Sequence, residues 1–287
     1  MPELPEVEVV KESLSRTITG KKIKKVSVKN SNLRIKIHKS FERRLQKKIV
    51  KKVKRFSKYI ILVLEDNSFC LIHLGMSGTI HLLRKNSLNQ KTNASFYHSP
   101  YLPKKHNHVF FEFDKIKIIY NDPRRFGYFK LLENKNKLEN FVSNYGPEPF
   151  SSKFDIKYVK KYLYKKEKSI KNFLLDQKFV SGLGNIYASE ILFKCKINPK
   201  KKAKYLSTKD FINIINYSRA ILNLAIRKGG SSIRDFKNII GKNGSFQDSF
   251  KVYNRENENC LSPGCRGIIR KKFITNRSTF FCNICQK

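Results

Sequence analysis

The chain has 287 residues, 61 of them Lys or Arg and 22 Asp or Glu, which gives a formal net charge of +39 at pH 7. This length allows two domains with cores of their own, and so large a charge attracts polyanions, so nucleic acid is the first partner to consider. No apolar run approaches the roughly 18 residues that a membrane helix needs, and the acidic, proline-containing start is unlike a secretory signal. We therefore expect a cytoplasmic, nucleoid-associated protein with no membrane partner.

The first half of the chain changes from a helical to a strand pattern. Val7, Val10, Leu14 and Ile18 recur at steps of three and four, which predicts an amphipathic helix over residues 5–19. From residue 23 to about residue 132, short β-rich runs such as YIILVL and HVFFEF alternate with polar turns. We expect a first domain over residues 1–133, an antiparallel β-sandwich or barrel with an N-terminal helix and a long polar loop over residues 84–107.

The second half is predicted to be mainly helical, which makes the fold α+β and multidomain. The segment YGPEPF marks a boundary, so residues 134–150 are expected to be a linker. Helical periodicity is strongest over residues 170–179, 185–195 and 208–228, within a domain that we place at residues 151–245. Residues 246–287 alternate aromatic and polar side chains around cysteine pairs and predict a β-hairpin.

Four of the six cysteines crowd into the end of the chain. Cys260 and Cys265 form a C-x4-C knuckle, and Cys282 and Cys285 form a C-x2-C knuckle after a gap of sixteen residues. Two such knuckles supply four thiolates for a closed tetrahedral zinc site. Because four sulfur ligands leave no open position, we expect one structural Zn ion that folds the hairpin and takes no part in catalysis.

The opening MPELPEVE has two interpretations. Prolines and acids at a helix start complement the helix dipole, and from this stretch alone that reading is the simpler one. In the other interpretation, removal of Met1 leaves Pro2 with a free secondary amine, a nucleophile able to form an iminium at a sugar C1′. Glu3 and Glu6 would then face the same pocket as proton carriers.

Three further motifs suggest contact with nucleic acid. The glycine-rich turn before Asn185 runs into a helix, where backbone N–H groups can hold a phosphate, although an ordinary helix–helix turn explains it equally well. NDPRRFG places Arg124, Arg125 and Phe126 on a turn between strands. HLGMSG places Met76 on another turn, where a long apolar side chain suits a wedge between bases as well as it suits a core.

Taken together and in order, MPELPEVE, RFSKYI, HLGMSG, NDPRRFG, GLGNIYASE, GGSSIRDF and the four-cysteine tail closely resemble the bacterial formamidopyrimidine-DNA glycosylases over nearly the whole chain. The resemblance implies a β-sandwich, a helix-two-turn-helix domain and a zinc finger. It also implies a monomeric base-excision repair enzyme that flips oxidised purines, such as 8-oxoguanine and formamidopyrimidines, out of double-stranded DNA and cleaves the strand at abasic sites by β,δ-elimination.

The resemblance also implies a role for each matching residue. Pro2 is the expected nucleophile, Glu3 the general acid/base at the sugar, and Glu6 a supporting carboxylate, while Lys58 in RFSKYI serves at the phosphates and in elimination. The residues expected to contact DNA fill the gap left by the flipped base, face the orphaned cytosine or hold the phosphate backbone: Met76, Arg124, Phe126, Asn185 and Arg277, with His73 and Arg125 in the same motifs. GGSSIRDF, residues 229–236, corresponds to the loop that covers the extruded base.

The sequence departs from the family pattern at three places. The first knuckle is C-x4-C where C-x2-C is usual, Ser245 stands where an aromatic residue is usual, and Asn254 stands where glycine is usual. Two other readings remain. Endonuclease VIII-like glycosylases prefer oxidised pyrimidines and usually have glycine at the position of Leu4, and a non-catalytic DNA-binding protein could share the scaffold.

Overall fold

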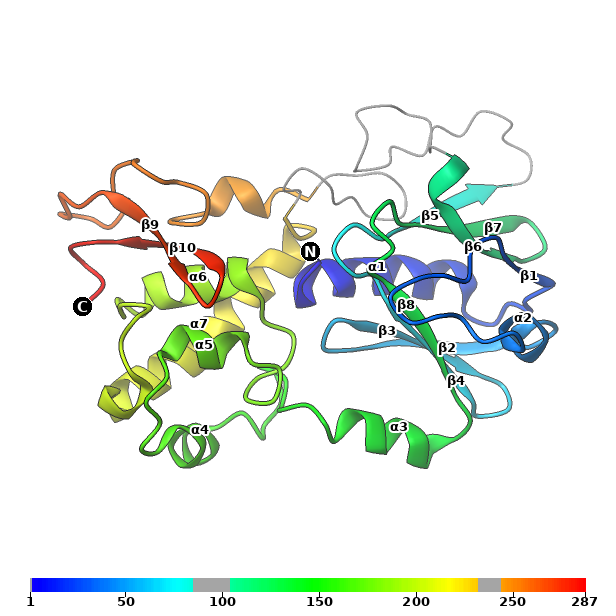
Figure 1. Ribbon diagram of the computed structural model, residues 1–287, viewed down its shortest axis with the longest axis horizontal. Coiled ribbons are helices and arrows are strands. Elements are labelled where there is room, and N and C mark those ends of the chain that lie inside the picture. The colour runs from blue at the N-terminus through cyan, green and yellow to red at the C-terminus, as the bar shows by residue number, and fades with distance from the viewer. Residues whose placement is uncertain (1, 85–103, 232–243) are drawn as a thin grey trace. The chain divides into compact units, whose positions relative to one another are not determined.

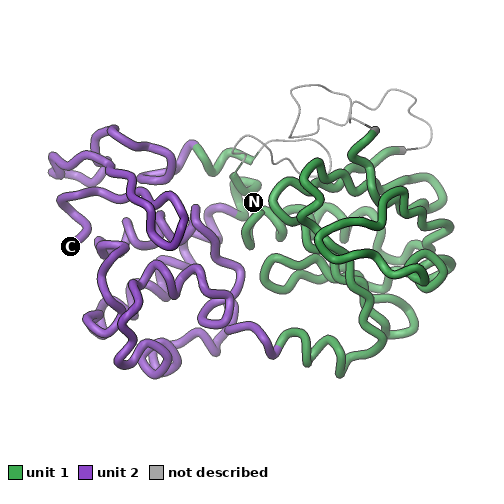
Figure 2. The backbone as a smooth tube through the Cα atoms, in the orientation of Figure 1, with its two compact units in different colours: residues 1–142, 226–247 green, residues 143–225, 248–287 purple. Residues whose placement is uncertain are grey.

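The computed structural model describes residues 2–84, 104–231 and 244–287. These residues form two compact units (Figure 2): unit 1 comprises Met1–Val142 and Ile226–Gln247, and unit 2 comprises Ser143–Ala225 and Asp248–Lys287. The expected loop over residues 84–107 falls largely outside the described residues, as do residues 232–236 of the GGSSIRDF motif. Among the described helices, none is long and apolar enough to span a bilayer.

Unit 1 is a sandwich of two antiparallel four-stranded sheets, ordered β1-β6-β7-β5 and β2-β3-β4-β8, which confirms the predicted fold class (Figure 1). Its elements are α1 Leu4–Ile18, β1 Lys25–Val28, α2 Phe41–Leu45, β2 Val50–Phe56, β3 Tyr59–Leu64, β4 Phe69–His73, β5 Thr79–Arg84, η1 Lys104–His106, β6 Asn107–Glu112, β7 Ile116–Asn121, β8 Tyr128–Leu132 and α3 Lys135–Val142.

The core of unit 1 lies between the two sheets and includes one face of α1. Val10 and Leu14 of α1 share a cluster of buried side chains with Leu62 of one sheet and Phe111 of the other. The three-and-four spacing of the apolar residues therefore places the apolar stripe of α1 against strands from both sheets. This packing holds the start of α1 on a rigid scaffold.

Residues 134–142, expected to belong to a linker, contain helix α3 instead. Leu138 and Phe141 are only partly buried, yet they pack against Ile61, Leu71 and Leu132 of the β2-β3-β4-β8 sheet. Two apolar contacts in eight residues are too few to produce a clear helical period, and this is why the sequence pattern did not predict the helix.

Unit 2 contains four helices and a β-hairpin within its described residues. Its elements are α4 Ile156–Leu163, α5 Ile170–Leu175, α6 Asn185–Lys194, η2 Ala203–Tyr205, α7 Thr208–Arg227, which ends in unit 1, η3 Phe246–Ser249 at the border with unit 1, β9 Ile269–Ile274 and β10 Arg277–Cys282. Asp155 caps α4 by accepting the Tyr158 N–H at 2.7 Å, and Ser169 caps α5.

Helix α5 ends four residues earlier than its apolar pattern predicts. Gln177 receives the Gly182 N–H at 2.9 Å on its Oε1 and donates Nε2 to the Leu183 carbonyl at 2.9 Å. The Gln177 side chain thus supplies hydrogen-bond partners to two backbone groups of the turn between α5 and α6. These bonds stand in for the helical hydrogen bonds that end with α5.

Candidate functional site

The start of α1 brings together the three residues that sequence analysis assigned to chemistry at the sugar. Pro2 is buried, and Glu3 and Glu6 are each only 2% exposed. Glu3 is the N-cap residue of α1, and its backbone N–H donates to Glu6 Oε2 at 2.9 Å. The two interpretations of MPELPEVE are therefore compatible. The same residues start the helix and bring two carboxylates together beside Pro2.

The second carboxylate oxygen of Glu6 accepts hydrogen bonds from the C-terminal segment of unit 1, residues 226–247. Ser231 donates both its backbone N–H, at 2.8 Å, and its hydroxyl, at 3.0 Å, to Glu6 Oε1. Gly230, at φ +78°, lies so close that an added Cβ would stand 3.1 Å from the same oxygen. Glu6 thus connects the N-cap of α1 to the first residues of the GGSSIRDF motif.

Lys58 occupies the tight turn between β2 and β3 and is only 7% exposed. Arg55 donates to the Ser57 carbonyl at 3.0 Å and to Glu8 of α1 at 2.5 Å. Burial raises the pKa of Glu8, but hydrogen bonds and charge from Lys11 and Arg55 outweigh it and hold the pKa below its usual value. This ion pair ties the turn that carries Lys58 to the first turns of α1.

His73 is the last residue of β4, and the charge of Lys58 affects its pKa. Burial, followed by the charges of Lys58 and Arg34, lowers the pKa of His73 to about 4. Its Nδ1 accepts the Gly75 N–H at 3.1 Å, so the neutral ring carries its proton on Nε2. His73 is therefore a neutral ring whose Nε2–H is a donor without positive charge.

Asp122 joins the two turns that carry the expected DNA-contacting residues. This carboxylate is 0% exposed and accepts hydrogen bonds from the Ser77 hydroxyl at 2.5 Å, the Tyr120 hydroxyl at 2.8 Å and the Gly127 N–H at 2.9 Å. The Ser77 hydroxyl in turn receives the Arg124 N–H at 3.2 Å. Sequence analysis quoted Asp122 within NDPRRFG but gave it no role, because its bond to Ser77, which joins the two turns, spans 45 positions of the sequence.

The same contacts place Met76, Arg124 and Phe126 on adjoining turns. Met76 and Phe126 are each 41% exposed, and the Arg124 guanidinium lies 4.6 Å from the centre of the Phe126 ring. An added Cβ on Gly75 would stand 2.4 Å from the Phe126 carbonyl carbon, so only glycine permits this approach. Two exposed apolar side chains and a guanidinium thus project from one rigid base.

In unit 2, Asn185 and Arg277 lie on neighbouring elements, α6 and β10. Asn185 Nδ2 donates to the Ser278 carbonyl at 2.8 Å, directly after the exposed Arg277. Thr275 donates to Asn172 of α5 at 3.0 Å and holds the tip of the hairpin on its other side. The Asn185 amide thus links the start of α6 to the residue that follows Arg277.

A buried lysine that sequence analysis did not single out lies under this region. Lys171 of α5 is 0% exposed, and its ammonium donates to the Ser189 hydroxyl at 3.0 Å. Ser189 donates onward to the Asn185 carbonyl at 2.8 Å. The only signal in the sequence was a lysine on the apolar side of a short helix, a position that cations seldom occupy.

The four terminal cysteines converge at one point of unit 2. Their sulfur atoms all lie within 4.8 Å of one another, with Cys260 and Cys285 3.7 Å apart and Cys265 and Cys282 3.6 Å apart. Zn–S bonds of about 2.3 Å in a tetrahedron require S–S distances of about 3.8 Å, so the donor set fits one metal ion of this kind. The longer first knuckle removes no ligand.

Glu190 of α6 anchors the cysteine hairpin. It is 3% exposed and accepts three backbone N–H groups, from Lys251 at 2.9 Å, Val252 at 3.0 Å and Tyr253 at 2.8 Å. The next residue, Asn254, adopts φ +59°, a left-handed conformation that asparagine tolerates better than any residue except glycine. The departure from glycine at this position therefore preserves the turn into the finger.

Comparison with known proteins agrees with this geometry. The family model described as the formamidopyrimidine-DNA glycosylase N-terminal domain matches residues 1–129, and that described as its H2TH domain matches residues 145–237. The formamidopyrimidine-DNA glycosylases of Afipia carboxidovorans and Roseobacter denitrificans are 37% and 40% identical to this chain, and each alignment covers 100% of both sequences.

Solved structures show the same likeness. A mutant of the Lactococcus lactis Fpg in complex with Fapy-dG-containing DNA aligns with a TM-score of 0.87 at 32% identity and covers 100% of both chains. The L. lactis enzyme with DNA containing an abasic site aligns with a TM-score of 0.86 at 32% identity and 99% coverage of both. Fold and site thus define a helix-two-turn-helix protein with a β-sandwich and a four-cysteine hairpin. The chain belongs to the formamidopyrimidine-DNA glycosylase family.

Proposed function

We propose that this protein is a bifunctional DNA glycosylase and abasic-site lyase of base excision repair. Its substrates are oxidised purines, 8-oxoguanine and formamidopyrimidines, in double-stranded DNA, and abasic sites. The observation that carries this proposal is the buried cluster of Pro2, Glu3 and Glu6 in a chain that matches its relatives over its full length. The relatives crystallised with Fapy-dG and abasic-site DNA support the choice of substrate.

The chemistry begins when removal of Met1 frees the Pro2 amine. The nitrogen lone pair attacks the sugar C1′ as the bond from C1′ to the damaged base breaks, and the base leaves with a proton. The amine nitrogen then loses its own proton, Glu3 donates a proton to the ring oxygen O4′ as the C1′–O4′ bond opens, and the nitrogen lone pair forms the C=N⁺ bond of an iminium. The resulting iminium draws electrons from the sugar, so the C2′ proton is lost and the 3′ phosphate leaves; a second elimination expels the 5′ phosphate. Glu6 holds Glu3 in place through the 2.9 Å bond to its backbone.

The remaining proposed roles concern the DNA itself. Lys58 meets a phosphate near the reacting sugar, and the neutral His73 donates its Nε2–H to another. Met76, Arg124 and Phe126 fill the gap that the flipped base leaves, with Arg124 facing the orphaned cytosine and Arg125 on the backbone. Arg277 and the start of α6 at Asn185 hold a phosphate together.

We further propose that the four cysteines bind zinc. Four thiolates with tetrahedral spacing are the ligand set that Zn²⁺ favours in closed structural sites, and such a site supplies folding energy to a small hairpin. The ion has no free coordination position, so its contribution is to hold β9 and β10, and with them Arg277, in place.

Borohydride trapping tests the reaction directly. The purified protein is incubated with a duplex that contains 8-oxoguanine opposite cytosine, reduced, and digested for mapping by mass spectrometry. We expect a covalent adduct on the nitrogen of Pro2. An adduct formed only with an oxidised-pyrimidine duplex would identify an endonuclease VIII-like enzyme instead. No adduct with either duplex or with an abasic site would mean a non-catalytic binding protein.

A further inference from the structure

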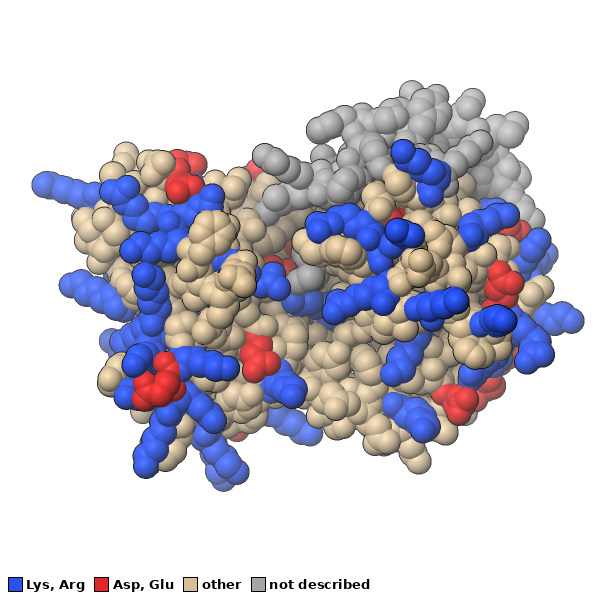
Figure 3. Space-filling view, viewed as in Figure 1, with Lys and Arg blue, Asp and Glu red and all other residues tan. Residues whose placement is uncertain are grey.

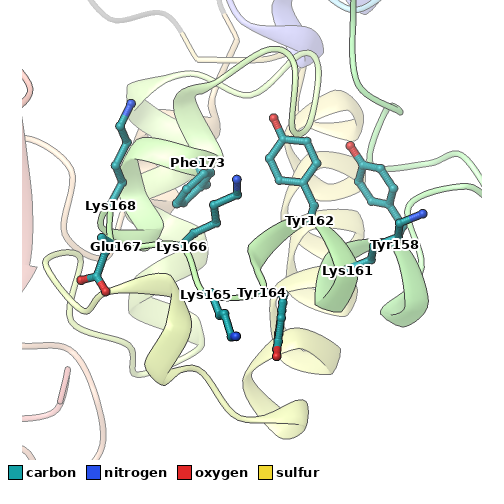
Figure 4. Close-up of a pocket in the computed structure, with 9 residues that line it drawn as sticks. All are labelled: Tyr158, Lys161, Tyr162, Tyr164, Lys165, Lys166, Glu167, Lys168 and Phe173. Carbon is teal, nitrogen blue, oxygen red and sulfur yellow. The ribbon is translucent and has the colours of Figure 1, made fainter.

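Unit 2 contains a groove of about 830 Å³ between α4 and the segment that leads into α5 (Figure 4). None of the residues proposed above for lesion chemistry lines it. Its volume lies in the range of about 300–1,000 Å³ that ligand sites occupy. The lining consists of aromatic and lysine side chains with a single acid: Tyr158, Lys161, Tyr162, Tyr164, Lys165, Lys166, Glu167, Lys168 and Phe173.

One wall of the groove is a fixed aromatic surface. The Tyr158 ring stacks on Phe179 with centroids 6.0 Å apart and planes inclined by 10°, and its hydroxyl donates to the Phe179 carbonyl at 2.8 Å. Tyr162 packs against Phe179 at 4.9 Å and edge-on against Phe173 at 6.2 Å. These interlocked rings present an apolar face that does not need to be ordered when a ligand binds.

The other wall carries positive charge that the protein does not neutralise. Among the described residues, no salt bridge involves any of the four lysines that line the groove. The single acid, Glu167, pairs instead with Lys202 at 3.0 Å and Lys204 at 2.7 Å, outside the groove lining. Hydrogen bonds from Lys204 and Lys202 lower the pKa of Glu167, so the carboxylate stays committed to them. The groove therefore keeps four cationic groups for an anionic ligand.

Backbone hydrogen bonds to residues 203–204 fix the conformation of the segment that carries three of these lysines. The Lys166 carbonyl accepts the Lys204 N–H at 3.1 Å, and the Lys168 carbonyl accepts the Ala203 N–H at 3.0 Å. Lys165 adopts φ +54°, a left-handed conformation that non-glycine residues seldom adopt. In this conformation its ammonium lies 5.2 Å from the centre of the Tyr164 ring.

The same tyrosine–lysine pair occurs a second time beside the groove. Lys204 places its ammonium 4.8 Å from the centre of the Tyr205 ring. Tyr164 is 66% exposed and Tyr205 is 63% exposed, so both rings are open to solvent. Among the described residues Lys165, beside Tyr164, makes no salt bridge, whereas Lys204, beside Tyr205, also pairs with Glu167 at 2.7 Å. An exposed ring with an adjacent cation is the combination that binds a nucleobase and its phosphate.

We propose that this groove binds a single-stranded stretch of nucleic acid, separately from the lesion site. Bases stack on Tyr164 and Tyr205, and the phosphates between them meet the groove lysines. An acidic peptide would also satisfy the lysines, but it offers no regular planar groups for two exposed tyrosine rings. A single strand presents planar bases and charged phosphates in alternation, which match the tyrosine rings and lysine ammonium groups of the protein.

Fluorescence anisotropy with a fluorescein-labelled oligo(dT) tests the proposal on the full-length protein. We expect Tyr164→Ala combined with Tyr205→Ala to weaken binding at least about 30-fold, because two stacked bases at about 1–3 kcal/mol each contribute about 2 kcal/mol or more. Lys165→Ala with Lys166→Ala should weaken it more than Lys21→Ala with Lys25→Ala, a pair of exposed lysines in unit 1 that changes the net charge equally. Trapping at Pro2 on a short lesion duplex should be unchanged in the tyrosine variant.

Photo-crosslinking locates the contact. An oligonucleotide that carries 5-iododeoxyuridine should crosslink to Tyr164 or Tyr205. The proposal fails if the tyrosine variant binds oligo(dT) like the wild type, or if the crosslinks map elsewhere. It also fails if a glutamate-rich peptide displaces the oligonucleotide at a lower concentration than unlabelled oligo(dT) does, because the groove would then be a protein-docking site. Trapping at Pro2 reports on the repair reaction independently of all these results.

Discussion

Glu3 and Asp122 are both buried carboxylates of unit 1, but their surroundings give them different roles. Glu3 stands beside Pro2 as the N-cap residue of α1. Asp122 is 0% exposed and accepts three hydrogen bonds from protein donors, so it is closed to a substrate. The first is suited to moving a proton and the second to holding two turns together.

Glu3→Gln tests the proton-transfer role. Because general acid/base groups contribute about 100-fold or more to a rate, we expect excision of 8-oxoguanine to fall by at least that factor. Cleavage of a preformed abasic site should be partly retained, since no base has to leave. Single-turnover kinetics on the two substrates separates the steps. An equal loss on both would contradict a role confined to base removal.

Asp122→Asn tests the positioning role. The amide cannot accept all three hydrogen bonds, so the turns with Met76 and Arg124 should loosen and excision from duplex DNA should fall about tenfold, with weaker preference for cytosine opposite the lesion. Borohydride trapping on a single-stranded abasic oligonucleotide, which leaves no gap to fill, should stay within about twofold of wild type. Val26→Ala, a core truncation in β1, controls for loss of stability.

If Asp122→Asn lowered both activities equally, its effect would be on folding as a whole. A double-mutant cycle with Met76→Ala adds a second check. Non-additive losses would show that the two residues act through one structure, whereas additive losses would contradict the proposed positioning.

At the scale of elements, the cysteine hairpin depends on both its ligands and its anchor on α6. Glu190 binds three consecutive backbone N–H groups before the first cysteine, and Gln286 joins the last residues to the Ile197 carbonyl at 2.9 Å. Burial raises the pKa of Glu190 against the lowering effect of these hydrogen bonds. The hairpin is therefore attached at both ends, and the four clustered cysteines hold the proposed metal between these attachments.

Cys282→Ser should remove the metal and with it the ordered position of Arg277. We expect no bound zinc by atomic absorption and at least a tenfold loss of affinity for lesion duplex. Cys195→Ser is the matched control, because this buried cysteine lies outside the metal cluster. Full DNA affinity without metal would show that the finger does not position Arg277.

At the scale of the whole molecule, the positive charge extends over the visible face of both units, with few acids among the Lys and Arg side chains (Figure 3). The groove between α4 and the segment that leads into α5 differs from a plain charged surface by its aromatic wall. The net charge alone thus points to nucleic acid but does not locate a site.

Two histidines whose pKa burial lowers, His73 and His81, make global stability sensitive to acid. Burial lowers the pKa of His81 to about 4, and burial with nearby cations lowers that of His73 to about 4. Both rings are neutral in the folded protein near neutral pH, while the unfolded chain takes up protons near pH 6.5. Their contribution to stability is therefore complete above about pH 6.5 and is lost as the pH falls toward 4.

We expect the melting temperature of the wild type to fall between pH 7 and pH 5, and His81→Gln to reduce this dependence. Differential scanning calorimetry across that range measures both. His38→Gln, at an exposed histidine, serves as the control and should leave the dependence unchanged. A His81→Gln curve parallel to the wild-type curve would contradict the assignment.

The sequence by itself determined the features that depend on local spacing. The three-and-four apolar pattern predicted α1, alternation predicted the sandwich, and the four-cysteine spacing predicted a metal cluster, because each property is written in neighbouring residues. Only the tertiary structure decided which residues support the site. Ser77 binds Asp122 across 45 positions, and Ser231 binds Glu6 across 225. Such partners depend on which strands pair and where the chain returns, and no local pattern records that choice.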